Sequence, residues 1–366
     1  MIKIVIRLLA LSALFCTACH AHADTFKILD LGSSIAVSGT GGVLSPSGSV
    51  VGYAGSPRVA AIDTNGTIAL LGTLSGIASN AFGINSMAYG INGAGKIVGQ
   101  SYVSNINPND HAFLYSNGKM TDLGTLGGSQ SSAFGINNGG QVVGWADTAS
   151  GNQRAFIDTN GKMLSLGSLG GNSYAYSIND NSQVVGYSFV NGNVQRAFIY
   201  ASGVMTAIGT LGGNSYADEI NNSGQVVGWS SLAGGANHAF LYSNGKLTDL
   251  GSLGGTDSAA LGINNIGQVV GWSLTGSGSY HAFLDANGSM VDLNSLVSLP
   301  QGIYLRDASA INNAGQIIAT GSNGDTYLLS VSVPEPPTYG LLVLSGFFLL
   351  ATLIRRRNSV AAEKAI

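Results

Sequence analysis

Apolar residues along this chain fall in short stretches, which are separated by turns rich in Gly, Asn and Ser. Residues 141–145 read Gln-Val-Val-Gly-Trp, and residues 112–115 read Ala-Phe-Leu-Tyr. Alternate side chains of a strand point to opposite faces, yet neither face of these stretches carries a charge. The pattern predicts short β-strands that are buried on both faces, as in a sheet that lies between two other sheets.

The stretches recur at a regular interval. Residues 111–124 and 238–251 have the same sequence, except that Met120 is replaced by Leu247. A Gly that follows an apolar pair marks one strand type, and between Gly99 and Gly271 its copies are 42 to 45 residues apart. A period of about 40–50 residues is typical of propellers and solenoids. The whole series is Gly52, Gly99, Gly144, Gly186, Gly228 and Gly271, with Ala319 in the last place.

Each period contains four predicted strands, for which residues 133–137, 141–145, 111–115 and 119–124 are examples from two neighbouring repeats. Asn117-Gly118 joins the last two of these strands. Asn-Gly tolerates a positive φ at both positions, which a two-residue type I′ hairpin requires. The same turn is predicted at 65–66, 160–161, 202–203, 244–245 and 287–288.

The strand count predicts how the repeats are arranged. The last repeat, at 325–331, has no fourth strand after it, whereas residues 27–32 form an isolated fourth strand at the N-terminus. We therefore expect an all-β fold: a seven-bladed β-propeller over residues 24–331, with four-stranded repeats of about 43 residues, closed by the N-terminal strand. A β-helix is less favoured, because its repeats are usually shorter and lack a regular hairpin signal.

The two ends of the chain differ from the repeats. Lys3 and Arg7 precede an apolar run and the small-residue motif Ala21-His22-Ala23, so residues 1–23 are predicted to be a secretory signal peptide. A lipoprotein site at Cys19 is the alternative. After Val333-Pro334-Glu335-Pro336, an apolar segment at 339–354 predicts a single transmembrane helix. The residues that follow it are Arg355, Arg356 and Arg357, and then a short tail at 359–366.

Two resemblances follow from these motifs. The His-Ala-Phe segments at 111–113, 238–240 and 281–283 resemble the HAF family of bacterial extracellular repeats. Residues 332–358 resemble a PEP-CTERM sorting signal, because Val333-Pro334-Glu335-Pro336, a hydrophobic segment and an Arg cluster occur in order. These resemblances imply an exosortase-type sorting protease as a partner, a transient membrane anchor, and release to the cell surface or outside the cell.

Candidate catalytic residues are few. Glu219 is the only glutamate between residues 26 and 331, and it lies beside Asp218, where other repeats have Phe-Gly or Tyr-Ser. A glycosidase needs two carboxyl groups about 5–10 Å apart. Asp218 and Glu219 are therefore the candidates for a polysaccharide-active enzyme, which is the alternative; the preferred interpretation is an exposed pair with no catalytic role.

Two sets of residues raise the question of metal binding. Asp63, Asp158 and Asp285 each begin an Asp-x-Asn-Gly motif that resembles the start of a calcium loop, but the later ligands are missing and a hairpin turn explains the motif better. The first His of the three His-Ala-Phe segments occupies an equivalent place in three repeats, where two other repeats have Arg. A hydrogen bond to a neighbouring loop is the preferred interpretation of these histidines, and no metal or other cofactor is expected.

Aromatic residues that follow the marker Gly, among them Trp145, Trp229 and Trp272, either stack on a sugar ligand or fill the space between blades. Only 9% of the residues are charged, against about 25% in an average protein. Residues 26–331 carry nine Lys and Arg against fifteen Asp and Glu, so nucleic acid is excluded as a partner. We expect a non-enzymatic binding or structural module of the cell envelope or matrix, with polysaccharide or a matrix protein as partner.

Overall fold

The computed structural model describes residues 26–37, 43–56, 58–74, 86–103 and 109–331. The described residues up to Ser330 form the first compact unit of the chain. The predicted signal peptide, sorting signal and transmembrane segment at 339–354 lie outside the described residues. In the part of the chain that is described, no helix is both long and apolar enough to cross a membrane.

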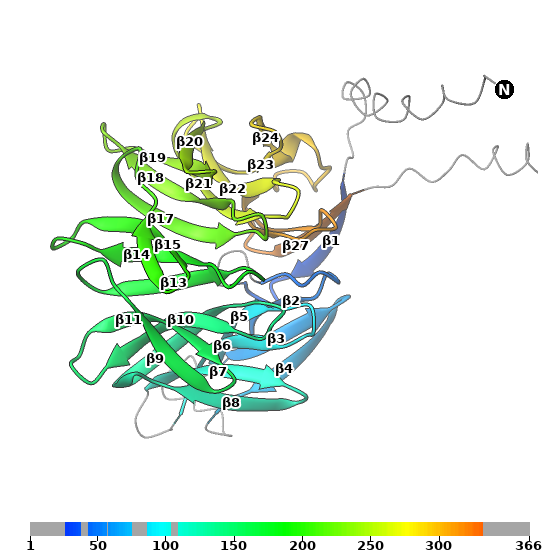
Figure 1. Cartoon of the computed structure of the whole chain (residues 1–366). Coiled ribbons are helices and arrows are strands. Elements are labelled where there is room, and N and C mark those ends of the chain that lie inside the picture. Colours follow the sequence, from blue (N-terminus) through cyan, green and yellow to red (C-terminus); the bar gives the residue numbers. More distant parts are fainter. Residues whose placement is uncertain (1–25, 38–42, 57, 75–85, 104–108, 332–366) are drawn as a thin grey trace, which may run out of the picture. The chain divides into compact units, whose positions relative to one another are not determined.

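The first unit is a β-propeller of seven antiparallel sheets, which follow one another in chain order and are numbered here as blades 1 to 7 (Figure 1). Blade 1 contains β2 (Val50–Ala54), β3 (Val59–Thr64) and β4 (Thr67–Gly72). Blade 2 contains β5 (Ser86–Ile91), β6 (Ile97–Tyr102), β7 (Asp110–Ser116) and β8 (Lys119–Gly124). Blade 3 contains β9 (Gly127–Ile136), β10 (Val142–Thr148), β11 (Gln153–Thr159) and β12 (Lys162–Gly167). Blade 4 contains β13 (Ser173–Ile178), β14 (Val184–Phe189), β15 (Gln195–Ala201) and β16 (Val204–Ala207). Blade 5 contains β17 (Gly212–Ile220), β18 (Val226–Leu232), β19 (Asn237–Ser243) and β20 (Lys246–Gly251). Blade 6 contains β21 (Gly254–Ile263), β22 (Val269–Thr275), β23 (Tyr280–Asp285) and β24 (Met290–Asp292). Blade 7 contains β25 (Leu305–Ile311), β26 (Ile317–Gly321), β27 (Thr326–Val331) and β1 (Phe26–Gly32).

The two ends of the propeller meet in blade 7. Its strand order is β1-β27-β26-β25, so the first strand of the chain lies beside the last, blue beside orange in Figure 1. Phe26 and Leu31 of β1 are buried, and the Thr326 hydroxyl donates to the carbonyl of Ile35 over 3.1 Å. The predicted seven-bladed ring and its closure by the N-terminal strand are both confirmed.

Blade 1 corrects the prediction of four strands in every repeat. It is a three-stranded sheet, and two isolated bridges, Ala36 with Tyr53 and Leu44 with Val50, take the place of its innermost strand. Because β1 belongs to blade 7, only residues 33–49 remain to fill this place. That segment is rich in Gly and Ser, which have a low strand propensity.

The hairpin turns were predicted correctly. Asn117 has a φ of 53° and Gly118 a φ of 76°, and positive φ at both central residues is what a type I′ turn requires. The same combination occurs at 65–66, 160–161, 202–203, 244–245 and 287–288.

Each Val-Val pair divides its two side chains between neighbouring blades. Val142 packs in one core with Val98 of blade 2, whereas Val143 packs in another with Val184 of blade 4. Both valines are fully buried. The prediction of strands buried on both faces is therefore confirmed.

The marker Gly lies opposite a β-bulge in the first strand of its blade. In blade 3 the pairing skips Phe134, so that Val143 faces Gly135 and Gly144 faces Ala133. A Cβ on Gly144 would lie 1.9 Å from the carbonyl oxygen of Ser132, which no side chain can accept. In blades 2 to 6 the Gly allows the close approach of the two strands beside the bulge, and the bulge turns one side chain of the first strand; blade 7 has the same bulge opposite Ala319.

Closure by β1 leads to a stability prediction. Deleting residues 26–32 removes two buried side chains and leaves β27 as an open, apolar edge, which is a template for aggregation. We expect a much lower melting temperature and self-association, measured by circular dichroism and light scattering. Deleting the tail at 359–366 serves as the control and should change neither quantity. A monomeric 26–32 deletion that melts at the parent temperature would show that β1 is dispensable.

Candidate functional site

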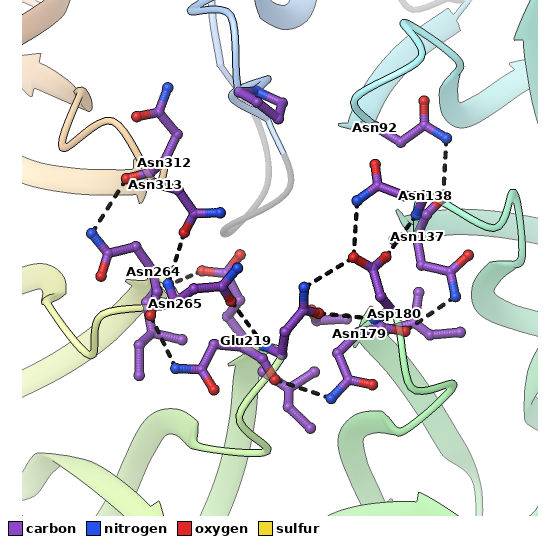
Figure 2. A pocket seen from close by; sticks show the side chains of 18 of the residues that line it. Asn92, Asn137, Asn138, Asn179, Asp180, Glu219, Asn264, Asn265, Asn312 and Asn313 are labelled. Atoms are coloured by element: carbon purple, nitrogen blue, oxygen red, sulfur yellow. Dashed lines mark hydrogen bonds between the residues drawn. The ribbon is translucent and has the colours of Figure 1, made fainter.

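The first strands of blades 2 to 7 are the innermost, since the residues that end them line one common pocket of about 170 Å³ (Figure 2). In blade 3 these are Ile136, Asn137 and Asn138. Leu44 and Pro46 represent blade 1. Polar side chains from blades 2 to 7 therefore converge at one mouth of the propeller axis.

A buried Asn links each of six blades to the next. The side-chain amide of Asn137 donates to the backbone carbonyl of Asn179 over 3.1 Å, and the side-chain amide of Asn179 donates to the backbone carbonyl of Asn221 over 3.0 Å. The same side chain organises its own loop, because the Oδ1 of Asn137 accepts from the N–H of Gln141. The set, called the inner Asn ring here, is Asn92, Asn137, Asn179, Asn221, Asn264 and Asn312, and it ends on the carbonyl of Ser45 in blade 1.

The residue after each ring Asn belongs to a second, exposed ring, whose hydrogen bonds also run from each blade to the next. The N–H of Asn138 donates to Asp180 over 2.9 Å, and the N–H of Asp180 donates to Asn222 over 3.0 Å. The side-chain amides of Asn138 and Asn222 also donate to the Asp180 carboxylate. Partial burial raises the pKa of Asp180, but these hydrogen bonds outweigh it and hold the pKa below its ordinary value. The ring residues satisfy one another, so a structural role explains the residues that follow Ile at the end of each first strand, such as Asn137-Asn138 after Ile136.

Asp218 is the bulge residue of blade 5. The equivalent residues in blades 2, 3 and 4 are Tyr89, Phe134 and Tyr176. The ring centroid of Phe134 is 5.2 Å from that of Tyr89 and 5.1 Å from that of Tyr176. Asp218 therefore places a carboxyl group where other blades have an aromatic ring. It is buried, and among the described residues its Oδ2 has no hydrogen-bond partner. Burial raises the pKa of Asp218 to about 7.

Glu219 occupies a place that is small in other blades, such as Gly135 and Gly262. A Cβ on Gly135 would already be 2.9 Å from the Tyr176 carbonyl of the next blade. The longer Glu219 side chain reaches blade 6 and accepts a hydrogen bond of 2.7 Å from the N–H of Ile263. Burial raises the pKa of Glu219 to about 8, although that hydrogen bond opposes the shift.

The two carboxyl groups do not share a substrate cavity. Glu219 lines the pocket at the mouth of the axis, whereas Asp218 is absent from that lining. One oxygen of Glu219 is held by a backbone N–H. The expectation that this pair is exposed is wrong, since Asp218 is buried and Glu219 is half-buried.

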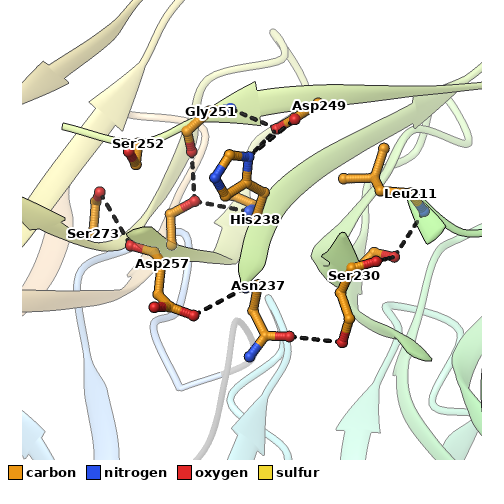
Figure 3. A network of polar contacts seen from close by, with 12 residues as sticks. Leu211, Ser230, Asn237, His238, Asp249, Gly251, Ser252, Asp257 and Ser273 are labelled. Carbon is orange, nitrogen blue, oxygen red and sulfur yellow. Dashed lines mark hydrogen bonds and ion pairs between the residues drawn. The ribbon is translucent and has the colours of Figure 1, made fainter. Parts of the chain in front are cut away.

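The three histidines lie in three different blades, and each pairs with an Asp on the next strand of its own blade. Figure 3 shows the contact between His238 and Asp249. The Nδ1 of His238 is 2.9 Å from the Asp249 carboxylate, and the Nδ1 of His111 is 2.9 Å from that of Asp122. The distance from His281 to Asp292 is 2.6 Å. These histidines do not converge on one ion, and their partners come from the fourth strand of the blade.

Blades with Arg instead of His lack this Asp. Arg154 donates to the carbonyl of Gln153, and Arg196 donates to the carbonyls of Gln195 and Gly213. The residues opposite are Ser165 and Ala207. The two positions therefore change together: blades with His at the first position have Asp at the second, and in blades with Arg the guanidinium donates to backbone carbonyls.

The calcium-like motifs are hairpin turns. The carboxylate of Asp63 accepts from the N–H of Gly66 over 2.8 Å, and Asp158 and Asp285 make the same contact with Gly161 and Gly288. All three aspartates are buried. Among the described residues, no group of three or more His, Cys, Asp or Glu side chains is placed to hold a metal ion.

The three tryptophans have two different settings. Trp145 lies 6.2 Å from Tyr174 of blade 4, and Trp229 stacks on Tyr216 at 4.4 Å, so both pack among other rings. Trp272 instead meets the exposed Tyr280 and lines a second pocket of about 300 Å³ between blades 6 and 7. The sorting-signal residues 333–336 and 355–357 lie outside the described part of the chain.

Three kinds of residue were missed in the sequence. Serines near the start of the first strands tie each blade to the preceding one: Ser131 accepts from the N–H of Ala112 and donates to the carbonyl of Gly124. The inner Asn ring was not predicted, although Asn follows Ile at the end of the first strand in six repeats. Arg306 and Asp307 line the second pocket. Aligning the repeats on the marker Gly shows Asp307 at the position that is Tyr in blades 4 and 5, which is a signal that could have found it.

Comparisons with known proteins identify the fold. A family model described as protein of unknown function (DUF3466) matches residues 168–327. No curated protein matches the chain. The β-propeller domain of the Trilobed protease from Pyrococcus furiosus, described as having an open velcro topology, has a TM-score of 0.53 at 10% identity, over 83% of this chain and 99% of that one.

Two further solved structures are similar at lower scores. Virginiamycin B lyase from Staphylococcus aureus, in complex with quinupristin, has a TM-score of 0.49 at 13% identity, over 84% of this chain and 100% of the lyase. TolB from Acinetobacter baumannii has a TM-score of 0.42 at 11% identity, over 77% of this chain. The chain spans 63% of the length of that TolB.

The buried carboxyl groups make stability depend on pH. The pKa values of Asp218 and Glu219 are raised in the folded state. Their protonated forms therefore contribute fully to the free energy of unfolding below about pH 4, and this contribution is lost as the pH rises through about 7 and 8. Urea unfolding between pH 5 and 9 should show a falling free energy of unfolding. Asp218→Asn and Glu219→Gln should each flatten that fall.

Asp180→Asn is the control, because the pKa of Asp180 is lowered and its contribution is lost toward acid. It should leave the decline toward alkaline pH as steep as in the parent. If the free energy of unfolding falls as steeply in both Asp218→Asn and Glu219→Gln as in the parent, the assignment of buried, protonated carboxyl groups is wrong.

Proposed function

We propose that this chain is an exported β-propeller that binds a component of the cell envelope or extracellular matrix without catalysing a reaction. The observation that carries the proposal is the separate placement of Asp218 and Glu219. Hydrolysis of a glycosidic bond requires two carboxyl groups that flank one bond. Here one carboxyl group is buried at a bulge and the other is bonded to the backbone of the next blade.

The remaining polar groups at the axis also favour a structural role. The amides of the inner Asn ring are engaged both with their own loops and with the next blade. Asp180 accepts three hydrogen bonds from Asn138 and Asn222. A general acid or base must be able to exchange a proton with a substrate, and these groups are already committed to neighbours.

Export and sorting are proposed from the two ends of the sequence. Residues 1–23 have the features of a signal peptide, and residues 332–358 resemble a PEP-CTERM signal with its Arg cluster. In this proposal an exosortase-type protease cuts near Pro334–Pro336. The protein is anchored in the membrane only until that cut releases it.

One observation favours a second candidate, a polysaccharide-active enzyme. Perturbed pKa values cluster at functional sites, and the pKa values of Asp218 and Glu219 are both raised, to about 7 and about 8. Glu219 also lines the pocket at the axis. In this candidate Glu219 acts as the general acid and Asp218 supports it.

Turnover and binding assays on the purified protein separate the two candidates. We expect saturable binding on an array of bacterial polysaccharides and glycans, with no release of reducing ends. Glu219→Gln, which keeps the hydrogen-bond acceptor for Ile263, should bind as the parent does. Turnover that Glu219→Gln abolishes, and that Asp180→Asn retains, would replace the proposal by the enzyme.

The sorting proposal has its own measurement. Intact-mass analysis of the protein released by a host with the sorting protease should show loss of residues 1–23 and of everything after about Pro336. Replacing Pro334 and Pro336 by Ala should retain the protein at the membrane in unprocessed form. A released, full-length species would contradict the proposal.

A further inference from the structure

Tyr side chains from the first strands fill the space between blades 3, 4 and 5. Tyr216 of blade 5 lies 4.1 Å from Tyr187 of blade 4, measured between ring centroids. Tyr174 of blade 4 takes the equivalent place beside Trp145 of blade 3. At each of these two interfaces a ring on the first strand of one blade meets a ring on the second strand of the blade before it.

Blade 7 has a carboxylate at this place. Tyr216 pairs across its sheet with Trp229, the residue after the marker Gly, and Asp307 pairs in the same way with Thr320, the residue after Ala319. Asp307 is much shorter than Tyr. The space beside Trp272 of blade 6 is therefore left open, and it forms the second pocket.

This pocket combines an aromatic wall with a charged one. Trp272 and Tyr280 meet at 63° with their ring centroids 5.1 Å apart, so the two rings form a corner instead of a flat stack. Leu261, the bulge residue of blade 6, closes the side toward the axis. Arg306 and Asp307 form the opposite side.

The donors of the pocket lack protein partners, whereas the Asp307 carboxylate is hydrogen-bonded to Thr320. Within the described residues, no hydrogen bond is made by the indole N–H of Trp272, the hydroxyl of Tyr280 or the guanidinium of Arg306. The equivalent place in blade 4 is different, because the Tyr174 hydroxyl donates to Gln153. Unpaired donors and a carboxylate beside an exposed aromatic wall are the ordinary composition of a ligand site.

We propose that the pocket between blades 6 and 7 binds one ring of a neutral sugar in a glycan. The apolar face of a pyranose ring packs on Trp272, and its hydroxyls fill the unpaired positions, with Asp307 as acceptor and Arg306 as donor. A side chain of each sign leaves no net charge for an ionic ligand to neutralise. At about 300 Å³ the pocket is at the small end of ligand sites, which suits one ring better than a chain buried along its length.

This inference rests on the proposed binding function and gives it a site and a ligand class. A quaternary ammonium group is the other ligand that aromatic corners take, but the exposed cation of Arg306 disfavours it. An acidic sugar is disfavoured by Asp307. Both therefore serve as competing probes.

Asp307→Tyr is the decisive variant, because it restores the side chain that fills the equivalent space in blades 4 and 5. It should close the pocket while keeping or raising the melting temperature. We expect neutral glycans to bind the parent protein and quench its Trp fluorescence, and binding to weaken about tenfold or more in Asp307→Tyr. Trp272→Phe, which keeps a ring but loses the indole N–H, should weaken binding less.

Trp145→Phe is the matched control, since Trp145 packs against Tyr174 at a filled interface, and it should bind like the parent. Glycan binding that is undiminished in Asp307→Tyr would place the ligand elsewhere and leave the proposed function intact. Preferential binding of choline or of uronic acids at this pocket would overturn the neutral-sugar assignment. Absence of any glycan binding by the parent would overturn it too, and turnover would overturn the proposed function itself.

Discussion

The hydrogen bond from a buried Asn side chain to the backbone of the next blade fixes the geometry of this propeller. Leaving a buried amide unpaired costs about 1–3 kcal/mol, so each ring Asn holds its neighbour at one distance and one rotation. The Asn179 amide also bonds to Gln183, which ties the link to the turn that follows. The spacing of the innermost strands, and hence the width of the axis, follows from this single contact.

Much of the fold could be predicted from the sequence, because repetition multiplies weak signals. One Asn-Gly pair is modest evidence for a hairpin, but the same turn at a fixed place in six repeats is strong evidence, and the structure confirms it. Blade 1 was not predictable in this way. Its inner segment departs from the repeat before Leu44, so repetition could not reveal that its described residues make two isolated bridges in place of a strand.

The candidate sites were harder to predict, because a site in a repeat protein is a departure from the repeat. Asp218 was noticed as such a departure, but its burial depends on a bulge that only the pairing register reveals. Asp307 went unnoticed, since its meaning depends on Trp272, which is distant in sequence and belongs to another blade. Periodicity identifies what the blades share, and contacts between blades decide where one of them differs.

Closure by β1 also sets an order of events in time. The strand that is synthesised first pairs with the strand that is synthesised last, and nearly the whole propeller lies between them. Bringing such distant segments together is slow, since the entropy of the intervening loop is lost before the contact is made. The ring therefore cannot close on a nascent chain: until residue 331 is available, blade 7 has no partner for β1, and the molecule remains an open array of blades.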